Sequence, residues 1–575
     1  MTVYKAKADR EGMLAIIKAR LVLLGNQQKK LQMLTRADSY SPVMKMITFR
    51  IFLCRYCGDP RVDFWQLDVE CAYLTAPTRH ETFINFPNRL RPKGDPPGSV
   101  YKLLKALYGG ADSGRCFYDD YLEFHLQLGF KMIPNEPCYL IYKCADGTFV
   151  AICFYVDDAA YAQFGTALWK WYLKRLATKY KFTLGALEHF LGLRIRRMVN
   201  GDFHIDLEAQ VARMLRTFHL DKASTKKVPT HDYRPTPEDR PISAKAIAAA
   251  SRFPMMAAVG HLNYLQQMLE WSITYPLKVA SKSVRDGAHG NAHHDWVKQV
   301  MLYLASNAWS RYVVYAQPAD ELILKVWSDA DHIKSVDDRR SLSGYLIMLG
   351  KTVIAWGASY QTIASHSSME SELMALDTSV RKLVGIIWLV EAMDCPKQPA
   401  VHILVDCDSA ILSAQNPIPS SRSSHIHMRY FYVQQLHVEG IIELEKVSTD
   451  DQLADILVTY KNKSNFDHLM LLTRGYDGRR VISHVQPQLP ESWVERSPHT
   501  SGGSTSGGQP PTASPSSPPL TPTMPASLAL PLTLPMPASL ALPLPKKLPV
   551  KPAKEIPDKP ANEIPVKPAK AVTFS

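Results

Sequence analysis

The chain has 575 residues, which is too long for one hydrophobic core, so its length predicts several domains. Its 67 lysines and arginines exceed 54 aspartates and glutamates, and the formal net charge of +13 favours a polyanionic partner such as nucleic acid. Nine scattered cysteines favour ordinary reduced thiols, and the charged N-terminus fits neither a signal peptide nor a membrane span. These features predict a cytoplasmic or nuclear protein without membrane contact, and they leave the oligomeric state open.

Composition divides the chain into four regions. Residues 1–225 have the apolar and amphipathic spacing of a folded domain, and a proline-rich linker, Val228–Ser243, follows. Residues 226–320 are mostly helical in pattern, and residues 321–460 return to mixed strand and helix patterns. Residues 461–575 form a C-terminal extension. From about residue 484 its short repeats carry proline every few residues, which predicts a disordered or polyproline-like tail.

Three aspartates in the first region accompany apolar strands. Phe149–Val156 is aromatic and β-branched and predicts a buried strand, with the returning strand after Asp158. Asp157 and Asp158 therefore fall at a hairpin turn, because neighbours on a straight strand point to opposite faces. Asp68 ends a short strand, Trp65–Leu67. Three carboxylates at two strand ends are a donor set for a pair of Mg²⁺ ions, although such a turn alone more often has a structural role.

Four acidic residues in the third region lie on four different predicted elements. Asp329 ends the predicted strand Leu322–His332, and Asp406 ends a later strand. Glu372 lies on one face of an amphipathic helix, and Asp455 lies on a short final helix. Each of them alone is more often a solvated turn residue. Carboxylates that converge from several elements nevertheless form a second two-metal arrangement suited to phosphodiester chemistry.

The segments around these residues resemble the Pol polyproteins of copia-type LTR retrotransposons. QLDVECAYL and YVDD resemble the catalytic motifs of the reverse transcriptase in that family. Further similar segments follow in the family's order: IKARLVLLGNQQ (17–28), SPVMKMITFR (41–50), VYKLLKALYGGADSGRCFY (100–118), FLGLRI (190–195) and FPMMAAVGHLNYLQ (253–266). The resemblance implies an α/β (α+β) architecture with a right-hand polymerase of fingers, palm and thumb, followed by a ribonuclease H-like domain.

The resemblance also implies roles for individual residues of the polymerase. Its metal-binding carboxylates correspond to Asp68, Asp157 and Asp158. Tyr73 corresponds to the aromatic residue that excludes a ribose 2′-hydroxyl by steric contact. Lys18 and Arg20 fall where basic residues approach the incoming triphosphate, and a solvated strand face is an equally good interpretation of that pair.

The second acidic group resembles the ribonuclease H motifs of the same family. SDADH, SSMESELMAL, VDCDSAILSAQNP and DQLADILV are similar to family segments, and this resemblance implies Asp329, Glu372, Asp406 and Asp455 as the matching residues. The resemblance implies two Mg²⁺ per active site, with Mn²⁺ as the alternative ion. It implies as partners an RNA template, a DNA primer, RNA–DNA hybrid and deoxynucleoside triphosphates, and it implies a location in a cytoplasmic virus-like particle or in the nucleus.

The chain departs from the family pattern at several positions. GADSGR replaces a more basic loop after LYG, and Ala159 and Ala160 replace bulkier residues behind the YVDD turn. Met1 stands close to a family motif, which implies truncated fingers. The sequence therefore predicts an RNA-directed DNA polymerase with a linked ribonuclease H. The alternative is a catalytically decayed or co-opted retrotransposon fragment that only binds nucleic acid.

Overall fold

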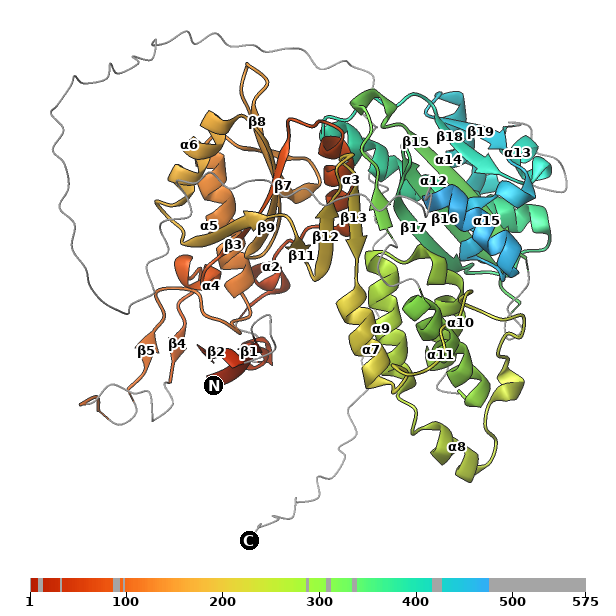
Figure 1. The fold of residues 1–575 in the computed structure, drawn as a ribbon, viewed down its shortest axis with the longest axis horizontal. Coiled ribbons are helices and arrows are strands. Elements are labelled where there is room, and N and C mark those ends of the chain that lie inside the picture. The colour runs from red at the N-terminus through yellow and green to blue at the C-terminus, as the bar shows by residue number, and fades with distance from the viewer. Residues whose placement is uncertain are drawn as a thin grey trace, which may run out of the picture. The chain divides into compact units, whose positions relative to one another are not determined.

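The computed structural model describes residues 2–8, 14–30, 34–85, 94–96, 99–285, 289–306, 312–332, 339–415 and 427–474. They form a mixed helix and sheet structure with a six-stranded, a four-stranded and a five-stranded sheet (Figure 1). The predicted proline-rich tail lies outside the described residues. Among the described helices, none combines the length and apolar character that crossing a bilayer requires.

The first part of the chain contains several short strands and helices. The strands are β1 (Thr2–Ala8), β2 (Leu14–Leu21), β4 (Phe83–Ile84) and β5 (Tyr101–Lys102), and the helices are α1 (Gly25–Lys30), α2 (Arg36–Ser39) and α4 (Ala72–Thr75). β1 pairs with β2, and β4 pairs with β5, both antiparallel. The segment after β2 is tied to the loop at Tyr108, because Leu23 N–H donates to Tyr108 O at 2.8 Å and Gly25 N–H donates to Gly109 O at 3.1 Å. These bonds bring the end of β2 next to the LYGG segment.

The six-stranded sheet has the strand order β10-β3-β9-β8-β7-β6, with antiparallel neighbours. Its strands are β3 (Asp63–Val69), β6 (Lys131–Ile133), β7 (Glu136–Lys143), β8 (Phe149–Tyr155), β9 (Asp158–Phe164) and β10 (Phe182–Ala186). The helices around it are α3 (Met46–Cys57), α5 (Ser113–Gln127) and α6 (Thr166–Leu176) (Figure 1). The interior of β9, including Ala159 and Ala160, is buried throughout, which requires cover on both faces of the sheet. Contacts of α6 and α3 with β8 supply such cover.

A four-stranded sheet and a group of helices follow. The strands, in sheet order, are β11 (His189–Phe190), β12 (Leu193–Arg197), β13 (Phe203–Asp206) and β14 (Tyr312–Val314). The helices are α7 (Glu208–Thr217), η2 (Pro237–Asp239), α8 (Ala244–Ala250), α9 (Met255–Met268), η3 (Trp271–Ile273), α10 (Thr274–Arg285) and α11 (Asn291–Ser306). α11 buries Val297, Val300 and Leu304 on one face, as their helical spacing requires. The helical character predicted from sequence for this region is present.

The five-stranded sheet has the strand order β17-β16-β15-β18-β19. Its strands are β15 (Leu324–Asp331), β16 (Leu342–Leu349), β17 (Thr352–Tyr360), β18 (Val401–Val405) and β19 (Ile442–Lys446). Its helices are η4 (Ala319–Glu321), α12 (Ser368–Ala392), α13 (Asp408–Gln415), α14 (His427–Val438), η5 (Thr449–Asp451), η6 (Leu453–Leu457) and α15 (Lys463–Arg474). α12 packs on β15 and β16, where Ser379 Oγ donates to Ser328 Oγ at 2.9 Å. α15 contacts η5, η6 and β17, although it begins beyond residue 460, the predicted end of this region.

A buried arginine connects elements of the first three regions. Arg50 of α3 is 5% exposed, and its guanidinium donates to the carbonyl oxygens of Gln267 and Met268 at 2.7 Å and of Ile354 at 3.0 Å. It also stacks over the Trp356 ring at 4.1 Å. Two of the acceptors are the carbonyl oxygens of the last two residues of α9. At this end of the helix the dipole is negative and favours a cation. Helix dipole and ring face together offset part of the cost of burying this charge.

Candidate acidic sites

The structure brings Asp68, Asp157 and Asp158 together at one end of β3, β8 and β9. Asp158 pairs with Tyr155 across the hairpin and with Asp68 across β3 and β9, so two aspartates face each other directly. Asp157 lies in the two-residue loop between the strands, and Val69 N–H donates to its carbonyl oxygen at 2.9 Å. The sequence interpretation placed both neighbouring aspartates in the turn and ended the first strand at Asp68. Instead, Asp158 begins β9 and β3 continues to Val69.

The loop that carries Asp157 has a strained backbone. Val156, its first residue, has φ of +60°. A two-residue hairpin loop requires positive φ at that position to match the twist of its strands, which is why glycine is preferred there. A β-branched residue in this conformation costs about 1–2 kcal/mol. The pairing of β8 with β9 on both sides holds the loop in this conformation.

Asp158 has the most perturbed carboxyl group of the three. Burial, and then the charge of Asp68, raise the pKa of Asp158 to about 7. Hydrogen bonds from Gln66 Nε2, at 3.3 Å, and from the Leu191 backbone N–H act in the opposite direction. A cation between Asp68 and Asp158 would favour the charged form of both carboxyls. Asp68 and Asp157 are exposed, so the site is open to solvent.

The predicted substrate-binding residues lie around one ring. Tyr73 packs edge-on against Tyr108 with centroids 5.2 Å apart, and the Arg20 guanidinium lies over the same ring at 4.9 Å. Burial, and then the charge of Asp157, raise the pKa of Tyr73, so its hydroxyl lies within electrostatic range of the aspartates. Lys18 lies on β2, but its side chain is outside the described residues. The sequence interpretation missed Tyr108, whose position in LYGG was the available signal.

The second site is a tighter and more deeply buried group. Asp329, Glu372 and Asp406 each offer a carboxylate oxygen, and these oxygens lie within 4.8 Å of one another. Within the described part of the chain, this is the one group of three or more such side chains that meets this limit. Asp329 and Glu372 are 5% and 8% exposed. Asp406 directly follows β18, and Asp329 lies two residues before the end of β15.

Asp455 joins this group from η6. Its carboxyl is buried, hydrogen-bonds with Asp329, and forms an ion pair with Lys461. Burial raises the pKa of Asp455, and Lys461 opposes that effect. All four acidic residues predicted in this region therefore converge, from β15, α12, the end of β18 and η6. Lys461 is a partner that the sequence interpretation did not identify.

The charge balance of the second site favours a bound cation. Burial, and then the charge of Asp406, raise the pKa of Glu372 to about 9. Burial, and then Glu372, raise the pKa of Asp329 well above its ordinary value. Glu372 Oε2 is buried and accepts no hydrogen bond from any described residue. Carboxylate oxygens are the donors that Mg²⁺ and Mn²⁺ prefer, so this donor set fits a divalent cation.

Two residues that sequence reasoning missed hold η6 in place. Gln452 is fully buried and donates to Ser328 O at 3.0 Å. Gly344 of β16 pairs with Asp329, and a Cβ there would lie 2.5 Å from Val458 Cγ1. The absence of a side chain therefore allows the η6 segment to approach the sheet. A glycine inside an apolar strand was the available signal, because it often marks a close approach.

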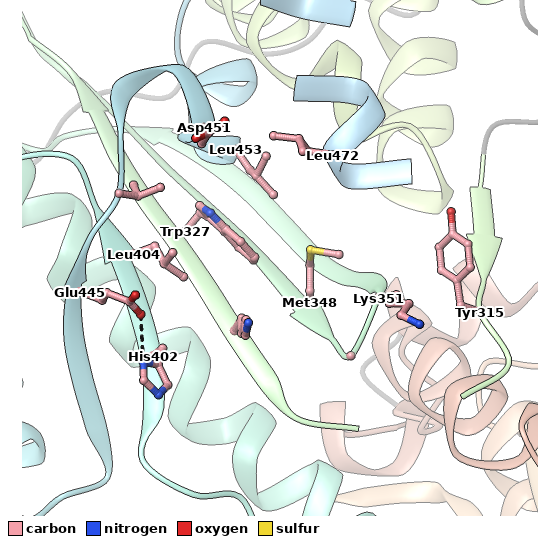
Figure 2. A pocket seen from close by; sticks show the side chains of 13 residues that line it. Tyr315, Trp327, Met348, Lys351, His402, Leu404, Glu445, Asp451, Leu453 and Leu472 are labelled. Atoms are coloured by element: carbon pink, nitrogen blue, oxygen red, sulfur yellow. Dashed lines mark hydrogen bonds and ion pairs between the residues drawn. The ribbon is translucent and has the colours of Figure 1, made fainter. Parts of the chain in front are cut away.

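A cavity of about 800 Å³ lies on the five-stranded sheet, but it is not this acidic group. Trp327, Met348 and Leu453 are among the side chains that line it, with the hydrogen-bonded pair of His402 and Glu445 to one side (Figure 2). None of the predicted acidic residues is among its lining residues. Trp327 precedes Asp329 by two positions on β15 and thus faces the same side of the sheet.

Known proteins are similar to most of this chain. The family described as "Reverse transcriptase (RNA-dependent DNA polymerase)" matches residues 1–232. The retrovirus-related Pol polyprotein from transposon TNT 1-94 of Nicotiana tabacum is 24% identical over 468 residues, which are 81% of this chain and 34% of that protein. The corresponding polyprotein from transposon RE2 of Arabidopsis thaliana is 27% identical over 467 residues, 79% of this chain and 30% of that protein. The chain thus spans about a third of the length of these curated relatives.

Among solved structures, an N-terminal RNase H domain from Mycobacterium tuberculosis aligns with 26% of this chain and 96% of its own. It is 14% identical, and the TM-score is 0.19. That score is too low to establish a shared fold.

Proposed function

Since this chain belongs to the copia-type retrotransposon Pol proteins, we propose that it is an RNA-directed DNA polymerase with a linked ribonuclease H. The observation that carries the proposal is the presence of two separate convergent acidic groups in one chain. One lies at the shared end of β3 and β9, and the other gathers around β15. Its substrates would be a primed RNA template, deoxynucleoside triphosphates and the RNA–DNA hybrid that results.

In the polymerase, Asp68 and Asp157 would contribute most of the metal binding, and Asp158 would support them. The divalent cations that these carboxylates would hold, Mg²⁺ or Mn²⁺ and two by the family's chemistry, would supply activation of the primer 3′-hydroxyl and stabilisation of the leaving pyrophosphate. Arg20, held on the Tyr108 ring, would present its guanidinium to the triphosphate. Tyr73, packed on the same ring, would close the sugar pocket against a 2′-hydroxyl.

In the ribonuclease, four carboxyls, of which Asp406 is half-buried and the others are buried, would share the cation-binding role: Asp329, Glu372, Asp406 and Asp455. Lys461 would orient Asp455 through their ion pair. The unshared oxygen of Glu372 is the strongest local support, because a buried carboxylate oxygen without a donor is costly unless a cation satisfies it. The substrate would be the RNA strand of the hybrid made by the first site.

The proposal is tested with the full chain on a primed RNA template with deoxynucleotides and Mg²⁺. We expect primer extension that Asp157→Asn lowers at least about 10²-fold, with ribonuclease activity on a labelled hybrid unchanged. Glu372→Gln should do the reverse, because the two groups are separate. Absence of extension in the wild type, with hybrid still bound, would support the alternative of a decayed or co-opted nucleic-acid-binding protein.

A further inference from the structure

The cross-strand pairing of Asp68 with Asp158 creates a problem that the two strands alone do not solve. Two like charges directly opposite each other on antiparallel strands repel, and their side chains tend to turn apart. A carboxylate pair that turns apart cannot share a cation. Something must therefore hold Asp158 beside Asp68 before a cation arrives. The residues that contact Asp158 on β3 and on the β11–β12 turn do this.

Gln66 is the first of these residues. It lies two positions before Asp68 on β3, so both side chains point to the same face of the sheet. Its Nε2 donates to Asp158 Oδ1 at 3.3 Å, and its Oε1 accepts from the His189 backbone N–H at 3.2 Å. The His189 N–H can only donate, so the amide is fixed with its NH₂ group toward Asp158.

The β11–β12 turn supplies the second contact. The Leu191 backbone N–H hydrogen-bonds the Asp158 carboxylate, and Leu191 and Gly192 both have positive φ, of +52° and +78°. The turn is held from the far side, because Gln210 Nε2 of α7 donates to Gly192 O at 2.6 Å and Tyr264 of α9 donates to Leu191 O at 3.3 Å. Two donors from a fixed frame thus converge on one carboxylate.

We propose that Gln66 is a positioning residue of the polymerase site, which together with the Leu191 N–H holds the Asp158 carboxylate beside Asp68 ready for a divalent cation. This inference rests on the proposed polymerase function. Partners that orient a ligating carboxylate contribute substantially to metal affinity, about 10-fold to 100-fold when removed. The chain's own FLGL turn, at residues 190–193, thereby acquires a role behind the catalytic hairpin.

The same pair of strands provides a matched control. Near the opposite end of β3 and β9, Gln163 Nε2 donates to Asp63 Oδ2 at 2.9 Å. Gln163→Leu therefore removes a glutamine–aspartate hydrogen bond from the same two strands without touching the acidic group. The ribonuclease activity of Gln66→Leu in a chain that keeps Glu372 is a second control.

The experiment uses the full chain carrying Glu372→Gln, so that the second acidic group contributes less to metal binding. Mn²⁺ binding is titrated by electron paramagnetic resonance, and the Mg²⁺ concentration for half-maximal primer extension is measured in parallel. Gln66→Leu should raise the Kd for Mn²⁺ and the half-maximal Mg²⁺ concentration about tenfold. It should lower kcat more than it changes the KM for deoxynucleotides. The Kd for primed template should stay within about twofold of wild type. Gln163→Leu should leave both metal values unchanged.

Two outcomes would overturn the proposal: unchanged Mn²⁺ affinity in Gln66→Leu, or an equal loss in Gln163→Leu. If Gln66→Leu does not fold, Gln66→Asn carries the test, because its shorter amide cannot bridge His189 and Asp158. Gln210→Ala, which only loosens the turn, should shift both values in the same direction but less. A wild type that fails to extend primers contradicts the proposed function, and the Mn²⁺ titration still decides the role of Gln66.

Discussion

The acidic group at the end of β3 and β9 and the group around β15 differ in their access to water. The first has two exposed aspartates on a strained hairpin loop, and only Asp158 is partly buried. The second gathers carboxyls from β15, α12, the end of β18 and η6, with exposed fractions below a tenth for Asp329, Glu372 and Asp455. An open site depends on backbone geometry to place its ligands. A buried site depends on packing, and it carries a larger electrostatic penalty when no cation is bound.

The largest effect is expected where packing sets the second site. Gly344→Ala would place a Cβ 2.5 Å from Val458 Cγ1 and displace the η6 segment that carries Asp455. We expect about 3 kcal/mol of destabilisation and at least a tenfold loss of ribonuclease activity, with primer extension within about twofold of wild type. Hybrid cleavage, primer extension and thermal unfolding measure these effects.

Gly185→Ala on β10 is the matched control for that substitution, because no described heavy atom lies within 4 Å of the added Cβ. Equal losses from Gly344→Ala and Gly185→Ala would contradict the role given to close packing at η6.

The electrostatic penalty of the buried group is tested by measuring the unfolding free energy as a function of pH without divalent ions. Glu372 has a pKa of about 9 in the folded chain and about 4.3 unfolded, so folding takes up a proton between these values. The stabilising contribution is complete below about pH 4.3 and is lost as the pH rises toward 9. Glu372→Gln should therefore raise the metal-free unfolding free energy at pH 8, by on the order of 2 kcal/mol. Denaturant unfolding at pH 5 and pH 8 measures it.

Asp158→Asn makes the same comparison at the open site. The pKa of Asp158 is raised to about 7, so its contribution to stability is also lost as the pH rises. The carboxyl is only partly buried, however, and accepts two hydrogen bonds. We expect a smaller gain at pH 8 than for Glu372→Gln. A gain as large as that of Glu372→Gln would remove the distinction between the two sites. In the presence of Mg²⁺ the wild type should be more stable than either variant, because only the wild type retains its full ligand set.

The smallest effect concerns the hairpin loop of the open site. Val156→Asn should stabilise the chain by about 1 kcal/mol, because asparagine tolerates φ of +60° better than a β-branched residue. Thermal unfolding checks this value. Val199→Asn, at an exposed valine without positive φ, should change stability little. A loss of stability from Val156→Asn would contradict the assignment of strain to the loop.

The sequence was sufficient for features that depend on local pattern. The apolar run before Asp157 predicted β8, and the helical spacing around Glu372 predicted α12. The family resemblance selected the acidic residues, and the structure brings them together in two groups. Their metal-binding roles remain predictions.

Other features depend on which segments pair, and one sequence does not give that. Gln66 meets Asp158 only because β3 pairs with β9, across 92 positions. Gly344 meets Val458 only because η6 returns to β16. Alternation along β3 and a glycine in an apolar strand were the local signals for these two residues. Neither signal predicts which residue the side chain or the glycine will contact.

The buried guanidinium of Arg50 bears on where the region that matches the reverse transcriptase family ends as a folding unit. The family match stops at residue 232, yet every carbonyl that accepts from Arg50 comes later, at Gln267, Met268 and Ile354. A fragment cut at the family boundary would keep a positive charge in α3 and lose its acceptors, together with the Trp356 ring. Truncation at residue 232 would remove the hydrogen-bond acceptors and the stacking ring of a buried cation. The segment that matches the reverse transcriptase family would therefore depend for its stability on residues translated after it.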